Sequence, residues 1–205
     1  MTQFYDFKID KIKNLSLEEK NLRKKNLDLF YQNGFPNKKN EDWKFTDLSS
    51  ILINSFKNIT NKDLYSDDKK LKLIDELEHN YIFLVDGKLN SNSFDHEEKD
   101  KIFIKNYNYT NKLTSDKKNS LTLLNNALAT GGFSLEISKN YQLKKPLVIY
   151  NYFSKNLKES IINNKNSIIM NEDSQLTLIN YIDDNSKDNF MMNVMDSVKI
   201  KKNAV

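Results

Sequence analysis

Two pairs of neighbouring carboxylates, Glu172–Asp173 and Asp183–Asp184, are the side chains of this chain best suited to acid–base chemistry. Enzymes that hydrolyse glycosidic bonds use two carboxyl groups that converge on one bond. Each pair here follows an alternating apolar run, and adjacent residues in a strand point to opposite faces, so neither pair converges without special geometry. The competing interpretation is that these acids cap the turns between strands through their own backbone.

Other catalytic chemistries lack the residues they need. The 205 residues include no cysteine and two histidines, His79 and His96, which excludes a thiol nucleophile and a Cys-ligated zinc or iron–sulfur site. Four glycines form neither a Gly-x-x-x-x-Gly-Lys phosphate loop nor a Gly-x-Gly-x-x-Gly fingerprint, and no Gly-x-Ser-x-Gly occurs. We therefore expect no catalytic, cofactor-binding or metal-binding residue, and no enzymatic activity.

The charge is basic but evenly spread. Lys and Arg total 32 against 28 Asp and Glu, a formal net charge of +4, and Arg23 is the only arginine. Guanidinium groups are the usual readers of guanine edges, so we expect no nucleic-acid partner, with a lysine-driven nucleic-acid binder kept as an alternative. No apolar run approaches the roughly 18 residues of a membrane span, and residues 1–10 are charged. We expect a cytoplasmic protein without a membrane partner.

The first part of the chain is predicted to be helical. Ser16 and Glu19 have the spacing of a capping box, and Gly34 followed by Pro36 ends the helix that begins there. Apolar spacing predicts a second helix over residues 67–79 and a third over residues 116–130.

The later part of the chain is predicted to be strand-rich. Residues 81–85 form an apolar run closed by Asp86-Gly87, and residues 102–104 form another. From Phe133 onward, short alternating runs follow one another with polar corners and no helix between them. This pattern favours a parallel β-helix, while an antiparallel sandwich stays open on pattern alone.

Trp43 is the one tryptophan, and it lies in Asn-Glu-Asp-Trp-Lys-Phe-Thr-Asp-Leu at residues 40–48. We interpret it as a buried anchor, with Asp42 or Thr46 capping the turn that follows. A ligand-stacking role is the alternative.

Several segments, in this order, resemble the SufB/SufD family of the Suf iron–sulfur cluster assembly system, and more closely its SufD subunit. The matching segments are residues 34–36, 41–48, 83–89, 123–132, 144–147 and 171–179. The resemblance implies a non-catalytic scaffold subunit that works with a SufB-like subunit and the SufC ATPase. It also implies that the assembled complex handles the cluster, with no cofactor bound by this chain alone. Glu41, Asp42, Trp43, Lys44 and Thr46 transfer as motif positions of structural role.

Together these interpretations predict an α+β fold, with an N-terminal helical region followed by the first turns of a right-handed parallel β-helix. The expected segments are a helical region at 1–80, a mixed α/β connection at 81–132 and an incomplete solenoid at 133–205. Family members are about twice this long, so we expect an N-terminal fragment whose partner contacts lie mainly in the absent C-terminal half.

Overall fold

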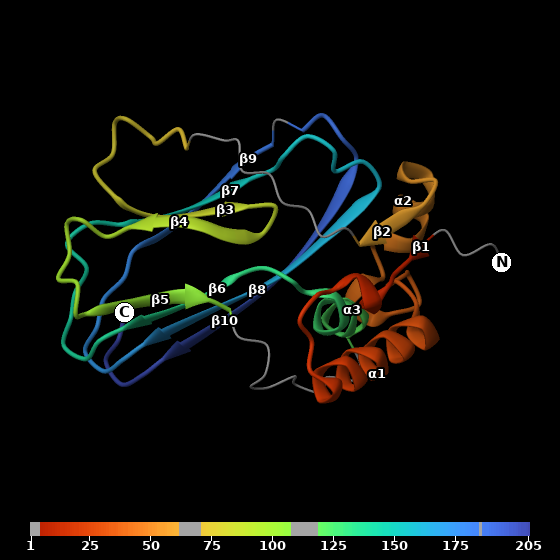
Figure 1. The fold of residues 1–205 in the computed structure, drawn as a ribbon, viewed down its shortest axis with the longest axis horizontal. Helices are drawn as coiled ribbons and strands as arrows, with labels where there is room; N and C mark the ends of the chain where they lie inside the picture. The colour runs from red at the N-terminus through yellow and green to blue at the C-terminus, as the bar shows by residue number, and fades with distance from the viewer. Residues whose placement is uncertain (1–4, 62–70, 108–118, 185) are drawn as a thin grey trace.

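The computed structural model describes residues 5–61, 71–107, 119–184 and 186–205, and places a helical layer at one end of two facing β-sheets (Figure 1). The helices are α1 (Leu17–Asn33), α2 (Leu48–Ser55) and α3 (Ser120–Leu128), with the short 3₁₀ helices η1 (Ile9–Lys11) and η2 (Glu41–Trp43). The strands are β1 (Tyr5–Asp6), β2 (Ile59–Asn61), β3 (Asn80–Val85), β4 (Lys88–Ser93), β5 (Ile102–Asn106), β6 (Phe133–Ile137), β7 (Leu147–Tyr152), β8 (Ser160–Met170), β9 (Leu178–Asp183) and β10 (Phe190–Ile200).

Both sheets combine parallel and antiparallel pairs. Sheet A has the order β1-β2-β8-β6-β5, and β10 also pairs with β8. Sheet B has the order β4-β3-β7-β9. The pairs β3–β4 and β5–β6 are antiparallel, whereas β6–β8, β8–β10, β3–β7 and β7–β9 are parallel.

The expected right-handed parallel β-helix is wrong. The described residues form a mixed α/β fold, because β4 and β5 add antiparallel partners to both sheets and three α-helices are interspersed among the strands. The apolar alternation located the strands from Phe133 onward correctly. It could not assign their partners, because strands in parallel and antiparallel sheets share the same two-residue period. A purely antiparallel sandwich is excluded too, since β8 and β10 pair in parallel from Ser160↔Phe190 to Met170↔Ile200.

The predicted helix starting at Ser16 is confirmed. The Ser16 side chain accepts a hydrogen bond from the Glu19 amide, and Gly34 ends α1 with φ +69°. In a full capping box the Glu19 carboxylate would accept from the Ser16 amide. Here it accepts a hydrogen bond from the Arg23 side chain in the next turn instead. Phe35 folds back onto Phe30, with ring centroids 5.0 Å apart.

The other two helix predictions are partly wrong. Residues 71–79 contain no helix, and residues 67–70 lie outside the described part of the chain. Apolar side chains of this stretch, among them Leu71, Ile74 and Leu77, instead pack on the outer face of sheet B. Helix α3 is shorter than predicted and begins after its cap Asn119, whose side chain accepts from the Thr122 amide; residues 116–118 lie outside the described ranges.

The three-segment division at 80/81 and 132/133 stays a prediction. Strands β1 and β2 belong to the segment expected to be helical, yet they extend sheet A: β2 pairs with the start of β8, and β1 pairs with β2.

Two cores hold the layers together. One lies between the sheets and is formed by alternating residues such as Leu84, Leu135 and Ile168. The other lies under the helices, where Phe30, Leu124 and Ile59 are each fully buried. Strand β8 contributes to both cores: Ile161 packs under the helices and Ile168 packs between the sheets.

Three glycines lie where three backbone segments cross in the middle of β8. Strand β8 pairs with β2 at its start and with β6 at its end, which leaves a gap along this edge. The segment that leaves α3 fills the gap: the Thr130 amide donates to Asn163 O (3.2 Å) and the Lys165 amide donates to Gly131 O (3.0 Å).

A side chain at this crossing would collide with backbone. A Cβ on Gly132 would lie 1.7 Å from Lys165 O, and one on Gly131 would lie 2.3 Å from Gly87 O. Gly132 also has φ +117°, which L residues rarely adopt. The hairpin tip at Gly87, the exit of α3 and the centre of β8 can therefore meet only because these positions are glycine.

We predict that Gly132→Ala destabilises the protein by about 3 kcal/mol or more, since the clash is with backbone and cannot relax through a side chain. Gly34→Ala is the matched control. Gly34 also has positive φ, but a Cβ there has nothing within 4 Å, so about 1 kcal/mol is expected. Urea unfolding followed by circular dichroism measures the loss of unfolding free energy in both variants. Equal losses would contradict the conclusion that the crossing tolerates a side chain less well than the end of α1.

Candidate functional site

The carboxylate pairs nominated from the sequence do not form a site. Glu172 forms an ion pair with Lys139 (2.8 Å), and Asp173 accepts from Asn203 Nδ2 (2.9 Å). Asp183 ends β9, whereas Asp173 lies in the turn that precedes β9, so the two pairs are at opposite ends of that strand. Converging carboxylates are required for glycoside hydrolysis, and this geometry removes that alternative.

The two histidines have separate environments. His79 Nδ1 lies 2.5 Å from Leu77 O, and His79 Nε2 lies 2.7 Å from the Tyr150 hydroxyl. Because a carbonyl oxygen only accepts, Nδ1 carries the proton, and His79 holds residues 71–79 against sheet B. His96 is exposed. Among the described residues no group of three or more His, Asp or Glu side chains could hold a metal ion.

The tryptophan motif lies on the surface of the helical layer. Trp43 ends η2 and is partly exposed rather than buried, while Glu41, Asp42, Lys44 and Thr46 are all exposed. The cap of the following helix is Asp47, whose side chain accepts from the Ser50 amide, and not Asp42 or Thr46. The structural role assigned to these motif positions stays a prediction.

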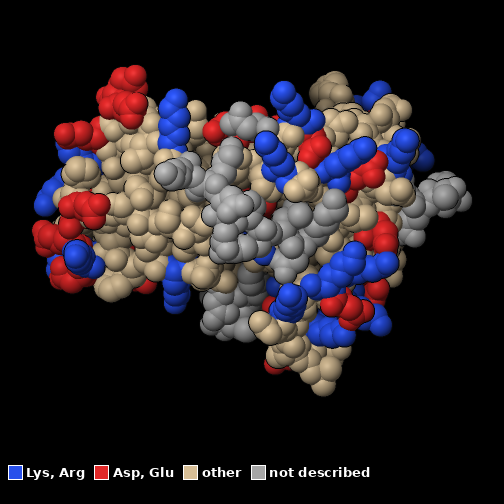
Figure 2. All heavy atoms as spheres, turned by 45° about the horizontal axis from the view of Figure 1, so that its top comes forward, with Lys and Arg blue, Asp and Glu red and all other residues tan. Residues whose placement is uncertain are grey.

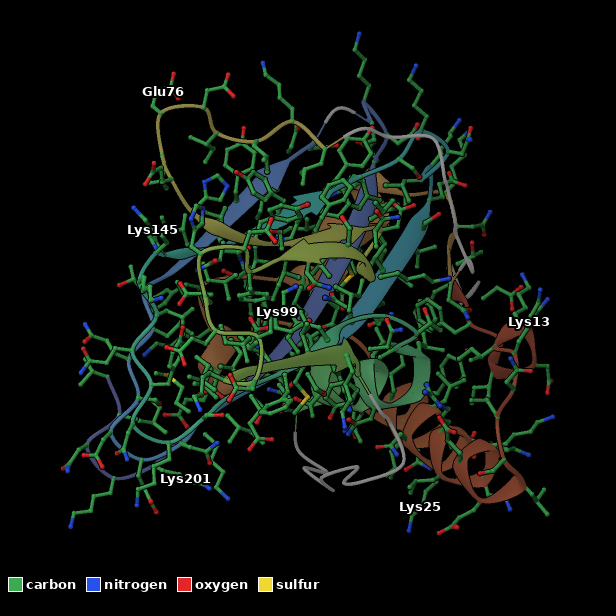
Figure 3. All side chains as sticks on the ribbon, turned by 60° about the vertical axis from the view of Figure 1, so that its left-hand side comes forward. Lys13, Lys25, Glu76, Lys99, Lys145 and Lys201 are labelled. Carbon is green, nitrogen blue, oxygen red and sulfur yellow. The ribbon has the colours of Figure 1, made fainter. Side chains whose placement is uncertain are left out.

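Surface charges of both signs are mixed. On the face drawn in Figure 2, basic side chains lie among acidic ones over the helical end, and acidic side chains gather at the opposite end. Labelled lysines such as Lys13, Lys25 and Lys201 extend outward from different elements (Figure 3). This arrangement does not favour the nucleic-acid alternative, which needs basic side chains clustered along one face. None of the described helices is long and apolar enough to cross a membrane.

Among the residues that the structure describes, two carboxylates are buried, and both hold backbone in place. Asp86 Oδ1 accepts from the Ser154 amide (2.9 Å) and Asp86 Oδ2 accepts from the Ser154 hydroxyl (2.7 Å). Glu97 accepts from Tyr141 Oη (2.7 Å), Asn80 Nδ2 (2.8 Å) and the amides of Lys144 and Lys145. The hydrogen bonds that these two side chains accept identify both of them as structural acceptors.

Glu97 has a lowered pKa, although burial alone would raise it. The hydrogen bonds from Tyr141 and Asn80, together with the amides of Lys144 and Lys145, stabilise the ionised form and outweigh the burial. The charged Glu97 carboxylate thus ties the loop between β4 and β5 to the start of β7.

Two cations are buried between α1, α3 and β8. Arg23 is 2% exposed and forms an ion pair with Glu19. Its Nη1 atom donates hydrogen bonds to Ala127 O (3.1 Å) and Ala129 O (2.9 Å). These carbonyls lie at the C-terminal end of α3, where a positive charge is favourable. The only arginine of the chain therefore joins α1 to α3.

Lys165 is the second buried cation, and its ammonium group donates to Asn126 Oδ1. Burial and the neighbouring Arg23 charge lower its pKa to about 8. The sequence signal that could have located it is the run Asn163–Ser167, five polar residues between apolar residues of one strand.

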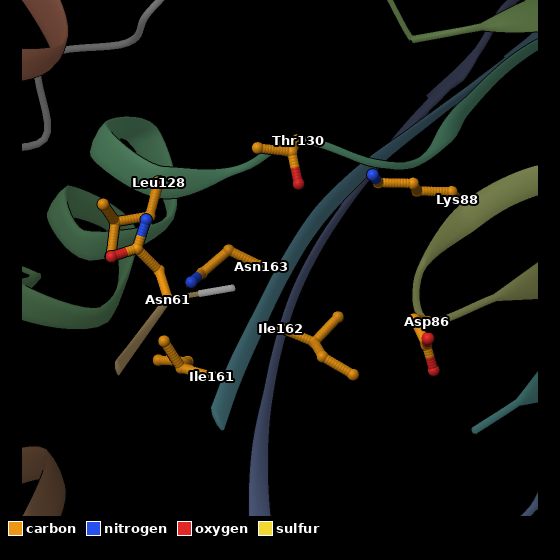
Figure 4. Close-up of a pocket in the computed structure, with 8 residues that line it drawn as sticks. All are labelled: Asn61, Asp86, Lys88, Leu128, Thr130, Ile161, Ile162 and Asn163. Atoms are coloured by element: carbon orange, nitrogen blue, oxygen red, sulfur yellow. The ribbon is translucent and has the colours of Figure 1, made fainter. Parts of the chain in front are cut away.

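A hollow lies beside the glycine crossing, between α3, β2, β8 and the β3–β4 hairpin (Figure 4). It encloses about 320 Å³ including its open mouth. Its lining residues are Asn61, Asp86, Lys88, Leu128, Thr130, Ile161, Ile162 and Asn163. Sequence reasoning did not identify any of these positions as a site, because they come from four separate segments.

The family model described as SufBD protein N-terminal region matches residues 1–149 of the chain. No curated protein matches it. The matched range includes α3 and the three glycines of the crossing, whereas strand β8, which they meet, lies beyond it.

We predict that Glu97→Gln weakens the acid dependence of stability. The folded pKa of Glu97 is below its unfolded value, so its stabilisation is present above that unfolded value, about 4.5, and is lost as pH falls through the folded pKa. Thermal unfolding from pH 7 to pH 3 should show a shallower decline for Glu97→Gln than for the control Glu98→Gln, whose side chain is exposed. Parallel curves for the two variants would contradict this role.

We predict that the protein becomes more stable as pH rises from 8 to 10 because of Lys165. Its folded pKa of about 8 lies below the ordinary lysine pKa of 10.5, so in this window the unfolded chain carries a proton that the folded chain lacks. Lys165→Met should remove this slope in urea unfolding, whereas Lys99→Met, at an exposed position, should keep it. An unchanged slope in Lys165→Met would show that the ammonium group is not the titrating group.

Proposed function

The chain belongs to the SufBD family, which acts in iron–sulfur cluster assembly, and we propose that within this family it is a non-catalytic scaffold subunit of the SufD type. The match to the SufBD N-terminal region is the observation that carries the proposal, since it spans residues 1–149. The ordered motifs at residues 41–48 and 123–132 support the SufD assignment.

The uses of the ionisable groups support a scaffold role. Asp86 and Glu97 are saturated by hydrogen bonds from neighbouring backbone and side chains, and Arg23 joins two helices. General acid–base catalysis needs a group that can reach a proton on a substrate, whereas these groups are directed to the protein's own backbone.

The composition supports the proposal that other subunits supply the cluster ligands and the ATPase activity. Thiolates are the usual ligands of iron–sulfur clusters, and the chain has no cysteine. In this proposal the cluster is cargo, and the thiolates that hold it come from a SufB-like partner. ATP hydrolysis is likewise assigned to a SufC-like partner, since the chain has no phosphate-binding loop. The complex is proposed to work in the cytoplasm.

The proposal is tested by co-expressing the tagged gene product with SufB-like and SufC-like proteins of the same genome. We expect all three to co-purify, the tagged product alone to show no ATPase activity, and anaerobic reconstitution to give an iron–sulfur absorption band only when the SufB-like partner is present. The two partners without the tagged product are the control. A tagged product that binds neither partner contradicts the proposal.

A further inference from the structure

Residues 71–79, which we call the strap, cover part of the outer face of sheet B without forming a helix or a strand (Figure 1). Leu71, Ile74 and Leu77 pack there on buried side chains of β3 and β7, among them Val148, which is fully buried. A segment of this kind lacks the ladder of backbone hydrogen bonds that holds a helix or a strand. It therefore depends on single side-chain contacts, and it belongs to the parts of a protein that open locally at low cost.

Tyr150 of β7 holds the strap at two points. Its hydroxyl accepts from the Ile74 amide (3.0 Å) and lies 2.7 Å from His79 Nε2. Nδ1 of His79 carries its proton toward Leu77 O, so Nε2 of the neutral ring is an acceptor and the Tyr150 hydroxyl donates to it. Two linked hydrogen bonds thus run from Ile74 through Tyr150 to His79.

A second proton on His79 is incompatible with this pair of hydrogen bonds. Histidine is the side chain that ordinarily changes its charge between pH 5 and 8. With Nε2 protonated, the hydrogens of the Ile74 amide, the imidazolium and the hydroxyl itself would all compete for space around the one Tyr150 oxygen. The hydroxyl keeps its own hydrogen, because burial raises the pKa of Tyr150 above its ordinary value, and that hydrogen would lose its acceptor.

The side of sheet B that faces the strap is aromatic. The ring of Tyr150 lies 5.6 Å from the His79 ring, centroid to centroid. Tyr81 of β3 and Tyr181 of β9 lie on the Tyr150 ring, with centroids 6.5 Å and 5.4 Å away. Phenol groups are uncharged at pH 8 and below, so these rings supply no negative charge to balance an imidazolium.

The charged groups of the strap itself are paired or exposed. Glu78 forms an ion pair with Lys145, which precedes β7. The hydrogen bond from Lys145 lowers the pKa of Glu78, and the charge of His96 contributes to the same shift. The remaining charged side chains of the strap are exposed, and Glu76 points outward in Figure 3: they are Lys72, Asp75 and Glu76. Water screens exposed charges, so they offset little of the cost of a proton on His79.

We propose that the strap is a pH-sensitive cover of sheet B, closed while His79 is neutral and released when Nε2 takes a proton. The released state accepts the proton more readily than the closed state, so acid shifts the equilibrium toward release. Release uncovers apolar side chains on the outer face, including Phe83 and Val148. The sheet itself stays intact, because β3 and β7 pair through their backbones.

A single introduced thiol tests this proposal, because the chain has no cysteine of its own. Val148→Cys places the thiol under the strap, and Lys99→Cys places one at an exposed position. Labelling by dithiodipyridine is measured in the full chain at pH 7.5 and pH 5.5. The rate at position 148 is divided by the rate at position 99, which removes the pH dependence of the thiolate. We expect this ratio to rise about threefold to tenfold at the lower pH, as loss of one hydrogen bond gives.

Three substitutions, each combined with Val148→Cys, identify the group responsible. His79→Gln keeps an acceptor for the Tyr150 hydroxyl but does not titrate, so the ratio should stay low at both pH values. Tyr150→Phe removes both hydrogen bonds and should raise the ratio at both pH values. His96→Gln is the matched control at an exposed histidine and should keep the rise at low pH.

A second measurement needs no substitution and serves if Val148→Cys fails to fold. Nuclear magnetic resonance follows exchange of the Ile74 amide with solvent, corrected for the intrinsic effect of pH. This exchange should become faster at pH 5.5 relative to the amides of β7.

Two results would overturn the proposal. One is the same labelling ratio, or the same corrected Ile74 exchange, at both pH values. The other is a rise at low pH that persists in His79→Gln. Because these measurements use no SufB-like or SufC-like protein, their outcome is independent of the scaffold proposal.

Discussion

The fold depends on a close approach of three backbone segments at the centre of β8. The gap that β2 and β6 leave along this strand is filled by the segment that leaves α3, and the hairpin tip lies against the same segment. Backbone can approach backbone this closely only where there is no Cβ, so Gly131 and Gly132 set the distance between the helical layer and the sheets.

The crossing also explains why so many polar side chains are buried near it. Where a helix end meets a strand, the regular hydrogen-bond ladders stop, and the backbone groups left over must find side-chain partners. Asn125 Nδ2 donates to Asn164 O (3.1 Å) and to Asn193 O (2.8 Å), and Arg23 serves the carbonyls of α3. The family-like segment at residues 123–132 is thus a junction of helix and sheet. The hollow lies beside this junction.

Local elements with strong end signals could be predicted. Ser16 and Gly34 locate the two ends of α1, because a side-chain cap and a residue with positive φ each depend on only one turn of the helix. Asp86-Gly87 locates the β3–β4 hairpin, because both residues must adopt positive φ there. The predicted helix over residues 67–79 was wrong in its described part, because the apolar side chains there pack on a sheet without forming a helix. Leu71, Ile74 and Leu77 cover sheet B as an irregular segment, and apolar residues at helical spacing are compatible with either structure.

From the sequence alone, the strands from Phe133 onward, the two ends of α1, the absence of thiolate chemistry and the likeness to the SufBD family could be determined, since each depends on residues close together or on composition. Tertiary structure alone decided that β5 pairs antiparallel with β6, that Arg23 and Lys165 are buried, and that Asn163 lines a hollow. These features join residues far apart in the chain, such as Arg23 and Ala129. Their geometry follows from how whole layers pack, which no local pattern of polar and apolar residues records.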